Sequence, residues 1–123
     1  PGIYPLNGAD ENSLVVTTVD FALTYFVVSG ELERSGVPLN LVINDAGGLS
    51  VLTSWAAGKF SSTSISEYIK TEVEPKVKCR KLVIPGKVAV LKGDLEAKLP
   101  GWEIIVGPRE AVKLVKFLKD MQA

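Results

Sequence analysis

The chain has 123 residues, of which 46% are hydrophobic and 23% are charged. This length and apolar content predict one folded domain with its own core and argue against disorder. The 14 basic residues balance the 14 acidic ones, so the chain lacks the basic excess of a general nucleic-acid or membrane-surface binder. One cysteine excludes an internal disulfide and a multi-thiolate metal site, and the absence of histidine excludes Ser-His-Asp triads and imidazole metal ligands.

The balanced net charge conceals an uneven distribution. Arg34 is the one basic residue within 1–58, and all the others lie in 59–123. Such polarity suits docking through complementary charge, and a chance distribution on a solvated surface explains it equally well. A transmembrane helix needs an apolar run of about 18 residues or more, and the sequence contains no run of that length. The chain begins at Pro1 without a charged-then-apolar leader, so we expect a piece of a longer protein.

Near residue 13 the sequence changes from turn-forming residues to β-branched residues, which predicts where the first strand begins. Residues 1–13 contain two prolines, two glycines and a polar run, which predicts a linker leading into a domain at 14–123. The β-branched run at 13–19 predicts a buried strand. A helix should follow over 21–34, because the segment continues through helix-forming residues to a Ser-Gly stop.

Strands and helices alternate along the rest of the chain. The pattern predicts strands at Leu39–Asn44, 79–84 and Glu103–Val106, with helices from Leu49, over 65–73, over 88–98 and from Pro108 onward. On the last helix the residues expected to be buried are Val112, Val115, Leu118 and Met121. This alternation predicts an α/β fold in which helices flank a mainly parallel sheet.

Folds of this class bind ligands beyond the carboxyl ends of their strands. The corresponding loops here are Thr17-Thr18, 45–48, Pro85-Gly86 and Gly107-Pro108. Three of them contain glycine, which allows a ligand to approach the backbone closely. Two of them also open a predicted helix, an arrangement that suits anionic or carbonyl groups, although plain tight turns account for the glycines equally well.

No motif identifies a catalytic apparatus. The dinucleotide fingerprint Gly-x-Gly-x-x-Gly is absent, and the AAGKF string at 56–60 departs from a phosphate loop at Thr53 and at Phe60. No two acidic residues fall in adjacent strand-end loops, so no acid–base pair is apparent. The residues therefore predict a ligand-binding α/β domain without naming its ligand, and a stand-alone nucleotide-binding enzyme remains the contrasting hypothesis.

Segments 16–33, 44–60 and 80–111 resemble the carboxyl-terminal domain of the large (gamma) subunit in the corrinoid iron–sulfur protein family, which has archaeal members in acetyl-CoA decarbonylase/synthase complexes. Long strings such as TSWAAGKF and LPGWEIIVGPREA carry the resemblance, which extends over essentially the whole chain. It implies a cytoplasmic, Rossmann-like cobalamin-binding domain at 14–123, tethered by 1–13. The corrinoid would be bound base-off, without a histidine ligand. An iron–sulfur cluster would belong to an N-terminal domain outside this chain.

The resemblance implies a methyl carrier of the reductive acetyl-CoA pathway that is not an enzyme on its own. Its cobalt would alternate between cob(I)amide and methyl-cob(III)amide, taking the methyl group from a methyltetrahydrofolate:corrinoid methyltransferase and giving it to acetyl-CoA synthase. The other implied partners are the small subunit and an ATP-dependent reductive activator, with no nucleic acid and no membrane. The alternative is a docking module for the activator or small subunit without autonomous corrinoid binding.

The same resemblance assigns a set of cofactor-binding residues. They are Thr18, Thr24, Gly48, Leu49, Ser50, Val51 and Ala111, with Pro85, Gly86, Gly107 and Pro108 as neighbours. The threonines should lie on the lower side of the corrinoid, and the loop at 48–51 should contact it through backbone amides and a hydroxyl. No residue is expected to act as a catalytic group or as a metal ligand.

Overall fold

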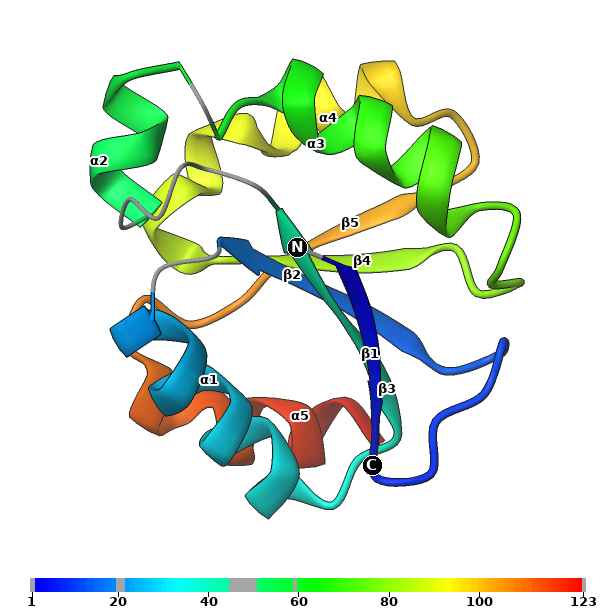
Figure 1. Cartoon of the computed structure of the whole chain (residues 1–123), viewed down its shortest axis with the longest axis vertical. Helices are drawn as coiled ribbons and strands as arrows, with labels where there is room; N and C mark the ends of the chain where they lie inside the picture. The colour runs from blue at the N-terminus through cyan, green and yellow to red at the C-terminus, as the bar shows by residue number, and fades with distance from the viewer. Residues whose placement is uncertain (1, 20–21, 45–50, 59, 123) are drawn as a thin grey trace.

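The computed structural model describes residues 2–19, 22–44, 51–58 and 60–122. Its strands form one five-stranded sheet with the spatial order β1-β3-β2-β4-β5 (Figure 1). The strands are β1 (Gly2–Leu6), β2 (Leu14–Val19), β3 (Leu39–Asn44), β4 (Lys81–Ile84) and β5 (Glu103–Val106). Strand β1 runs antiparallel to β3, whereas the other neighbours are parallel. The expected α/β, Rossmann-like architecture with a mainly parallel sheet is confirmed.

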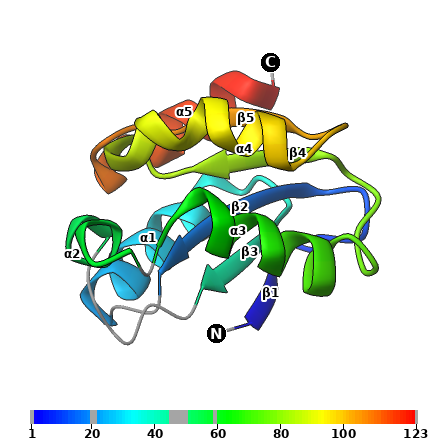
Figure 2. The same ribbon diagram turned by 90° about the horizontal axis from the view of Figure 1, so that it is seen from above.

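Helices cover both faces of the sheet (Figures 1 and 2). One face carries α1 (Ala22–Ser35) and α5 (Leu114–Gln122), and the other carries α2 (Val51–Ala56), α3 (Ser62–Tyr68) and α4 (Lys92–Lys98). The described residues also form a π-helical turn at Ile69–Val73, a 3-10 segment at Gly86–Leu91 that is kinked at Val88, and a 3-10 turn at Ala111–Lys113. The parallel strands are therefore joined by helical connections, as parallel pairing requires.

Alternate residues of each central strand enter opposite cores. On β2, Val15 packs beneath α3 and α4, while Val16 packs against α1 and α5. On β4, Leu82 and Ile84 enter the first core and Val83 enters the second. Strands that are buried on both faces are mostly apolar, which explains the apolar and β-branched residues that made these strands predictable.

The expectation of a linker at 1–13 is wrong for Gly2–Leu6. These residues form β1, which pairs with β3 in the register Gly2↔Ile43 to Leu6↔Leu39. The strand lies at the edge of the sheet, where proline is tolerated because one side of the strand needs no hydrogen bonds. The turn that follows is also fixed: the Asn7 side chain donates to the carbonyls of Leu32 and Val37, each at 3.0 Å.

The last helix begins later than expected. Pro108 precedes a 3-10 turn at Ala111–Lys113, and α5 starts only at Leu114. Val112 is therefore 67% exposed, which contradicts its expected burial, while Leu118 is fully buried as expected. The helix buries Leu114 and Leu118, one turn apart, against α1 and the sheet.

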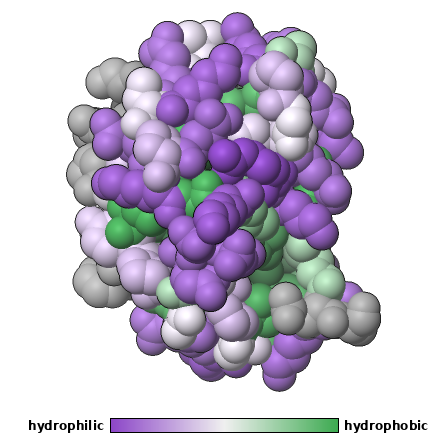
Figure 3. Space-filling view, turned by 90° about the vertical axis from the view of Figure 1, so that its right-hand side faces the viewer, coloured by the Kyte–Doolittle hydropathy of each residue, from purple (hydrophilic) through white to green (hydrophobic). Residues whose placement is uncertain are grey.

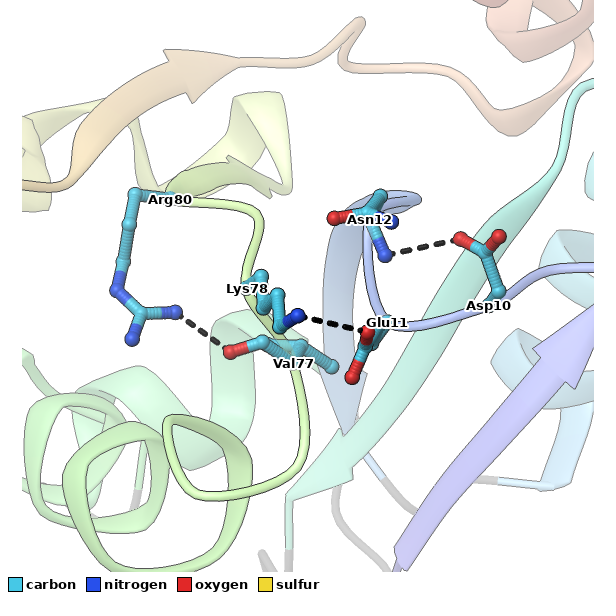
Figure 4. Close-up of polar contacts among 6 residues, drawn as sticks. All are labelled: Asp10, Glu11, Asn12, Val77, Lys78 and Arg80. Atoms are coloured by element: carbon cyan, nitrogen blue, oxygen red, sulfur yellow. Dashed lines mark hydrogen bonds and ion pairs between the residues drawn. The ribbon is translucent and has the colours of Figure 1, made fainter.

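The end of the molecule that contains the β1–β2 turn and the connection into β4 is largely hydrophilic (Figure 3). There the Glu11 carbonyl accepts from the backbone amide of Lys78 at 2.6 Å, and the Lys78 ammonium lies 3.0 Å from the Glu11 carboxylate (Figure 4). Arg80 donates to the Val77 carbonyl at 2.7 Å, which fixes the same connection. Across the described parts of the chain, no helix is long and apolar enough to span a membrane.

Candidate functional site

A cavity of about 340 Å³ lies at the carboxyl edge of the sheet. Its floor comes from the ends of β2 and β4 and from the loops that follow β4 and β5; the floor residues are Val16, Thr17, Thr18, Val83, Ile84, Pro85, Gly107 and Pro108. Strand β2 points toward this end of the molecule, beside which α2 lies (Figures 1 and 2). The cavity therefore occupies the position at which α/β folds of this class bind their ligands.

Apolar side chains make most of the cavity wall. Helix α1 contributes Val27 and Val28, α2 contributes Val51 and Leu52, and Leu114 comes from the start of α5. Val27 and Leu52 are about half exposed, at 48% and 46%, so they form the rim rather than the floor. Half-exposed large apolar residues beside a cavity favour contact with an apolar ligand.

Buried hydrogen bonds fix the backbone at the end of β2. Asn44, the last residue of β3, donates through its side-chain amide to the Thr17 hydroxyl and to the Thr18 carbonyl, the latter at 3.3 Å. The Thr17 hydroxyl in turn donates to the Val42 carbonyl at 3.2 Å. These bonds are shielded from water and hold both threonines at the cavity floor, so that the polar part of the site is pre-organised.

The loops after β4 and β5 touch through their backbones. A Cβ atom on Gly86 would lie 2.5 Å from the Gly107 carbonyl oxygen and 2.7 Å from the Arg109 amide nitrogen. The Gly107 amide donates to the Ile84 carbonyl at 2.9 Å. Close packing between the two loops thus accounts for Gly86, which does not line the cavity and which we had expected to leave room for a ligand.

The cavity brings together some of the residues expected to bind the cofactor. Thr18, Val51, Pro85, Gly107 and Pro108 line it, and Thr18 is only 3% exposed. The backbones of Thr24 and Ala111 belong to α1 and to the 3-10 turn before α5, but their side chains lie outside the described part of the structure. Gly48, Leu49 and Ser50 also lie outside the described residues.

Other lining residues were missed by sequence reasoning. Lys87 and Arg109 line the cavity, although each is an ordinary surface cation in the sequence. Asn44 supports the floor, and the sequence contained a clue to this role: Asn44 is an amide residue at the carboxyl end of a strand that is buried along its whole length. The sequence could not identify Val27 and Leu52 as rim residues, because their position depends on how α1 and α2 pack.

The described side chains do not form a cluster suited to direct metal coordination. Among the described residues, no three His, Cys, Asp or Glu side chains gather in a group that could hold a metal ion. No charged side chain other than Lys87 and Arg109 lines the described part of the cavity. The geometry therefore suits a largely apolar organic ligand with polar substituents.

The sheet and its two helical layers define a Rossmann-like α/β domain with a candidate ligand-binding cavity at the carboxyl edge of the sheet. The family model described as "CO dehydrogenase/acetyl-CoA synthase delta subunit" matches residues 1–118. Because this match covers nearly all of the chain, the chain belongs to that family.

Curated relatives agree with this assignment. The "Corrinoid/iron-sulfur protein large subunit" of Moorella thermoacetica is 48% identical over 115 residues, which cover 93% of this chain and 26% of the relative. The "Acetyl-CoA decarbonylase/synthase complex subunit gamma" of Methanopyrus kandleri is 42% identical over 120 residues, covering 97% and 26%. The same subunit of Methanocaldococcus jannaschii is 36% identical, covering 98% and 25%. The chain thus spans about a quarter of the length of these relatives, and the resemblance seen in its sequence is confirmed.

Proposed function

We propose that the chain is a corrinoid-binding domain that takes part in methyl transfer within a longer subunit of this family. The observation that carries the proposal is the apolar cavity at the carboxyl edge of the sheet, where Thr18 and Val51 line the floor and wall. The names of the relatives, which include a corrinoid/iron-sulfur protein large subunit, supply the ligand class.

The residues present fit part of a corrinoid. A corrin ring has a periphery rich in methyl groups and carboxamide side chains, and the apolar wall with buried threonines at the floor matches that mixture. A cavity of about 340 Å³ receives one part of so large a ligand, with the remainder against the half-exposed rim of Val27 and Leu52. Pro85, Gly107 and Pro108 would approach from the loops after β4 and β5.

The protein would position the cofactor without donating an axial ligand. The chain has no histidine, so it cannot place an imidazole on cobalt, which fits a base-off state. The bound corrinoid would supply a cobalt centre able to carry a methyl group from a methyltetrahydrofolate:corrinoid methyltransferase to acetyl-CoA synthase. The side chains of this domain would contribute binding, orientation and exclusion of water.

The remaining activities belong to partners in this proposal. One cysteine cannot hold an iron–sulfur cluster, so the cluster would lie elsewhere in the longer protein. The small subunit, the methyltransferase, acetyl-CoA synthase and an ATP-dependent reductive activator would approach the exposed side of the corrinoid in turn. The domain would then be a cytoplasmic carrier and not an enzyme on its own.

The proposal is tested by loading the purified chain with hydroxocobalamin under anaerobic conditions and removing the excess by desalting. We expect a retained corrinoid with a base-off absorption spectrum. The Leu52→Asp variant should retain at least about tenfold less, because it places a charge on the apolar rim. The matched control is Val90→Asp, since Val90 is 72% exposed and does not line the cavity.

Two outcomes would contradict the proposal. A folded wild-type chain that retains no corrinoid would favour the docking module without autonomous binding. Equal retention by both aspartate variants would place the corrinoid away from this cavity. Circular dichroism of all three proteins separates a loss of binding from a loss of folding.

A further inference from the structure

Lys87 and Arg109 are the charged residues among the described lining of the cavity. Lys87 follows β4 and Arg109 follows β5, and both are exposed residues of the cavity lining. The remaining described lining residues are apolar side chains, two threonines and a glycine. Because β4 and β5 are neighbouring parallel strands, their carboxyl ends deliver the two cations to the same side of the cavity.

Lys87 lies in the 3-10 segment after β4 and Arg109 lies in the loop after β5, and backbone contacts hold these two segments together. Gly86 lies against Gly107 and Arg109 so closely that no side chain fits between them. The Gly86 amide donates to the Pro108 carbonyl at 3.4 Å, and the Gly107 amide donates to the Ile84 carbonyl at 2.9 Å. The positions at which Lys87 and Arg109 leave the backbone are therefore fixed relative to each other, which lowers the cost of binding one ligand group with both.

No carboxylate compensates these charges within the described parts of the chain. The ion pairs found there are Arg34 with Glu31 and Lys78 with Glu11, and neither involves the cavity. Two like charges beside a low-dielectric cavity raise the local potential and attract an anion. Arginine in particular matches the paired oxygens of a phosphate group.

We propose that Lys87 and Arg109 form a subsite for the phosphodiester of a cobamide's nucleotide tail. This inference rests on the proposed corrinoid binding. The peripheral carboxamides of a corrin are neutral, so the phosphodiester is the anionic group of the ligand's organic framework. In a base-off cobamide the tail is no longer anchored to cobalt through its base, and a pair of cations at the cavity edge holds it against the protein.

The test compares cobalamin with cobinamide, which has the corrin ring but lacks the nucleotide and its phosphodiester. Affinities are measured by spectroscopic titration for the wild type, for the double variant Lys87→Gln/Arg109→Gln and for the control Lys113→Gln. Lys113 is exposed and close in sequence but does not line the cavity. The double variant should bind cobalamin about 5- to 20-fold more weakly and should keep its affinity for cobinamide within about twofold.

Salt gives a second readout of the same contact. Raising the ionic strength should weaken cobalamin binding by the wild type more than by the double variant, because the screened charges are absent from the variant. The control variant should follow the wild type in both measurements.

The possible outcomes distinguish a failure of the phosphodiester subsite from a failure of the proposed corrinoid binding. A wild-type chain that binds neither ligand overturns both. If the wild type binds both ligands, equal weakening of both in the double variant, or unchanged cobalamin affinity, overturns the phosphodiester subsite alone. Unchanged cobalamin affinity would assign the cations to another role, such as contact with an acidic partner protein.

Discussion

Gly86 shows how a single missing side chain allows two segments beside the cavity to pack closely. Its Cβ position would lie 2.5 Å from a backbone oxygen, an atom that cannot move without displacing the whole loop after β5. We therefore expect Gly86→Ala to lower the free energy of unfolding by about 2–4 kcal/mol, measured by urea denaturation. Gly93→Ala is the control, since Gly93 lies in α4 and, apart from its chain neighbours and the backbone of its own helix, no atom lies within 4 Å of its Cβ position.

The control should change stability in the opposite direction. Alanine in an exposed helix is favoured over glycine by up to about 1 kcal/mol, so Gly93→Ala should stabilise the fold. Similar losses in the two variants would mean that the contact between the loops after β4 and β5 is not as close as described.

Tyr68 is the residue at which a pH dependence is expected. Burial raises the pKa of its phenol above the usual 10.0, and the nearby Glu72 carboxylate and Tyr4 add to the rise. The unfolded chain therefore loses this proton at lower pH than the folded chain does. The stabilising contribution is fully present below about pH 10 and is lost as the pH rises through the higher folded pKa.

The Tyr68→Phe variant removes this titration. Urea denaturation between pH 8 and 11, a range that brackets the usual tyrosine pKa of about 10, should show a steeper loss of stability in the wild type than in the variant. Parallel pH profiles for the two proteins would count against the raised pKa.

At the scale of elements, Asn7 links the edge strand to a helix. It has a φ of 56°, and its amide satisfies the Leu32 and Val37 carbonyls at the end of α1 and beyond it. Asn7→Ala should lower the free energy of unfolding by about 2–3 kcal/mol, because it loses both hydrogen bonds and places a less suitable residue in the left-handed region. Chemical denaturation measures this change.

Asn7→Gly separates the two causes. Glycine adopts the positive φ freely but cannot donate to the carbonyls, so its stability should lie between those of the wild type and the alanine variant. Equal stability of the glycine and wild-type proteins would show that the hydrogen bonds contribute nothing.

The same edge explains where sequence reasoning succeeded and where it failed. The strand Leu39–Asn44 was predicted with its observed bounds because four of its six residues are apolar, and all six are buried in the structure. Strand β1 was missed because its sequence, GIYPL, contains a glycine and a proline, which are unusual in strands. The strand forms because it pairs with β3. Short-range patterns cannot reveal an element whose stability comes from a strand more than thirty residues away.

The candidate site was predictable to a similar extent. Its place at the strand ends followed from the α/β alternation, and residues such as Thr18 and Pro108 do line the cavity. Lys87 and Arg109 could not be distinguished from other surface cations, because only the contact between their loops brings them to one cavity. Fold-class rules thus locate the site, while long-range packing selects several of its residues.

At the scale of the whole molecule, the cavity is lined by residues from both hydrophobic cores. Val51 and Ile84 belong to the core beneath α3 and α4, whereas Val16, Val83 and Leu114 belong to the core beneath α1 and α5. A ligand in this cavity contacts both faces of the sheet at its carboxyl edge. Its binding free energy should therefore appear as resistance to global unfolding, because local opening of either core would destroy the site.

Cobalamin at about 100 times its dissociation constant should stabilise the chain by about 2.7 kcal/mol. For a domain of this size, that corresponds to a rise in Tm of roughly 8–14 °C, measured by thermal denaturation followed by circular dichroism. The Val90→Asp control should show the same rise, and Leu52→Asp should show little at the same cobalamin concentration, because the charge lies on the apolar rim. A full rise in the Tm of Leu52→Asp would mean that cobalamin stabilises the fold from a site outside the cavity.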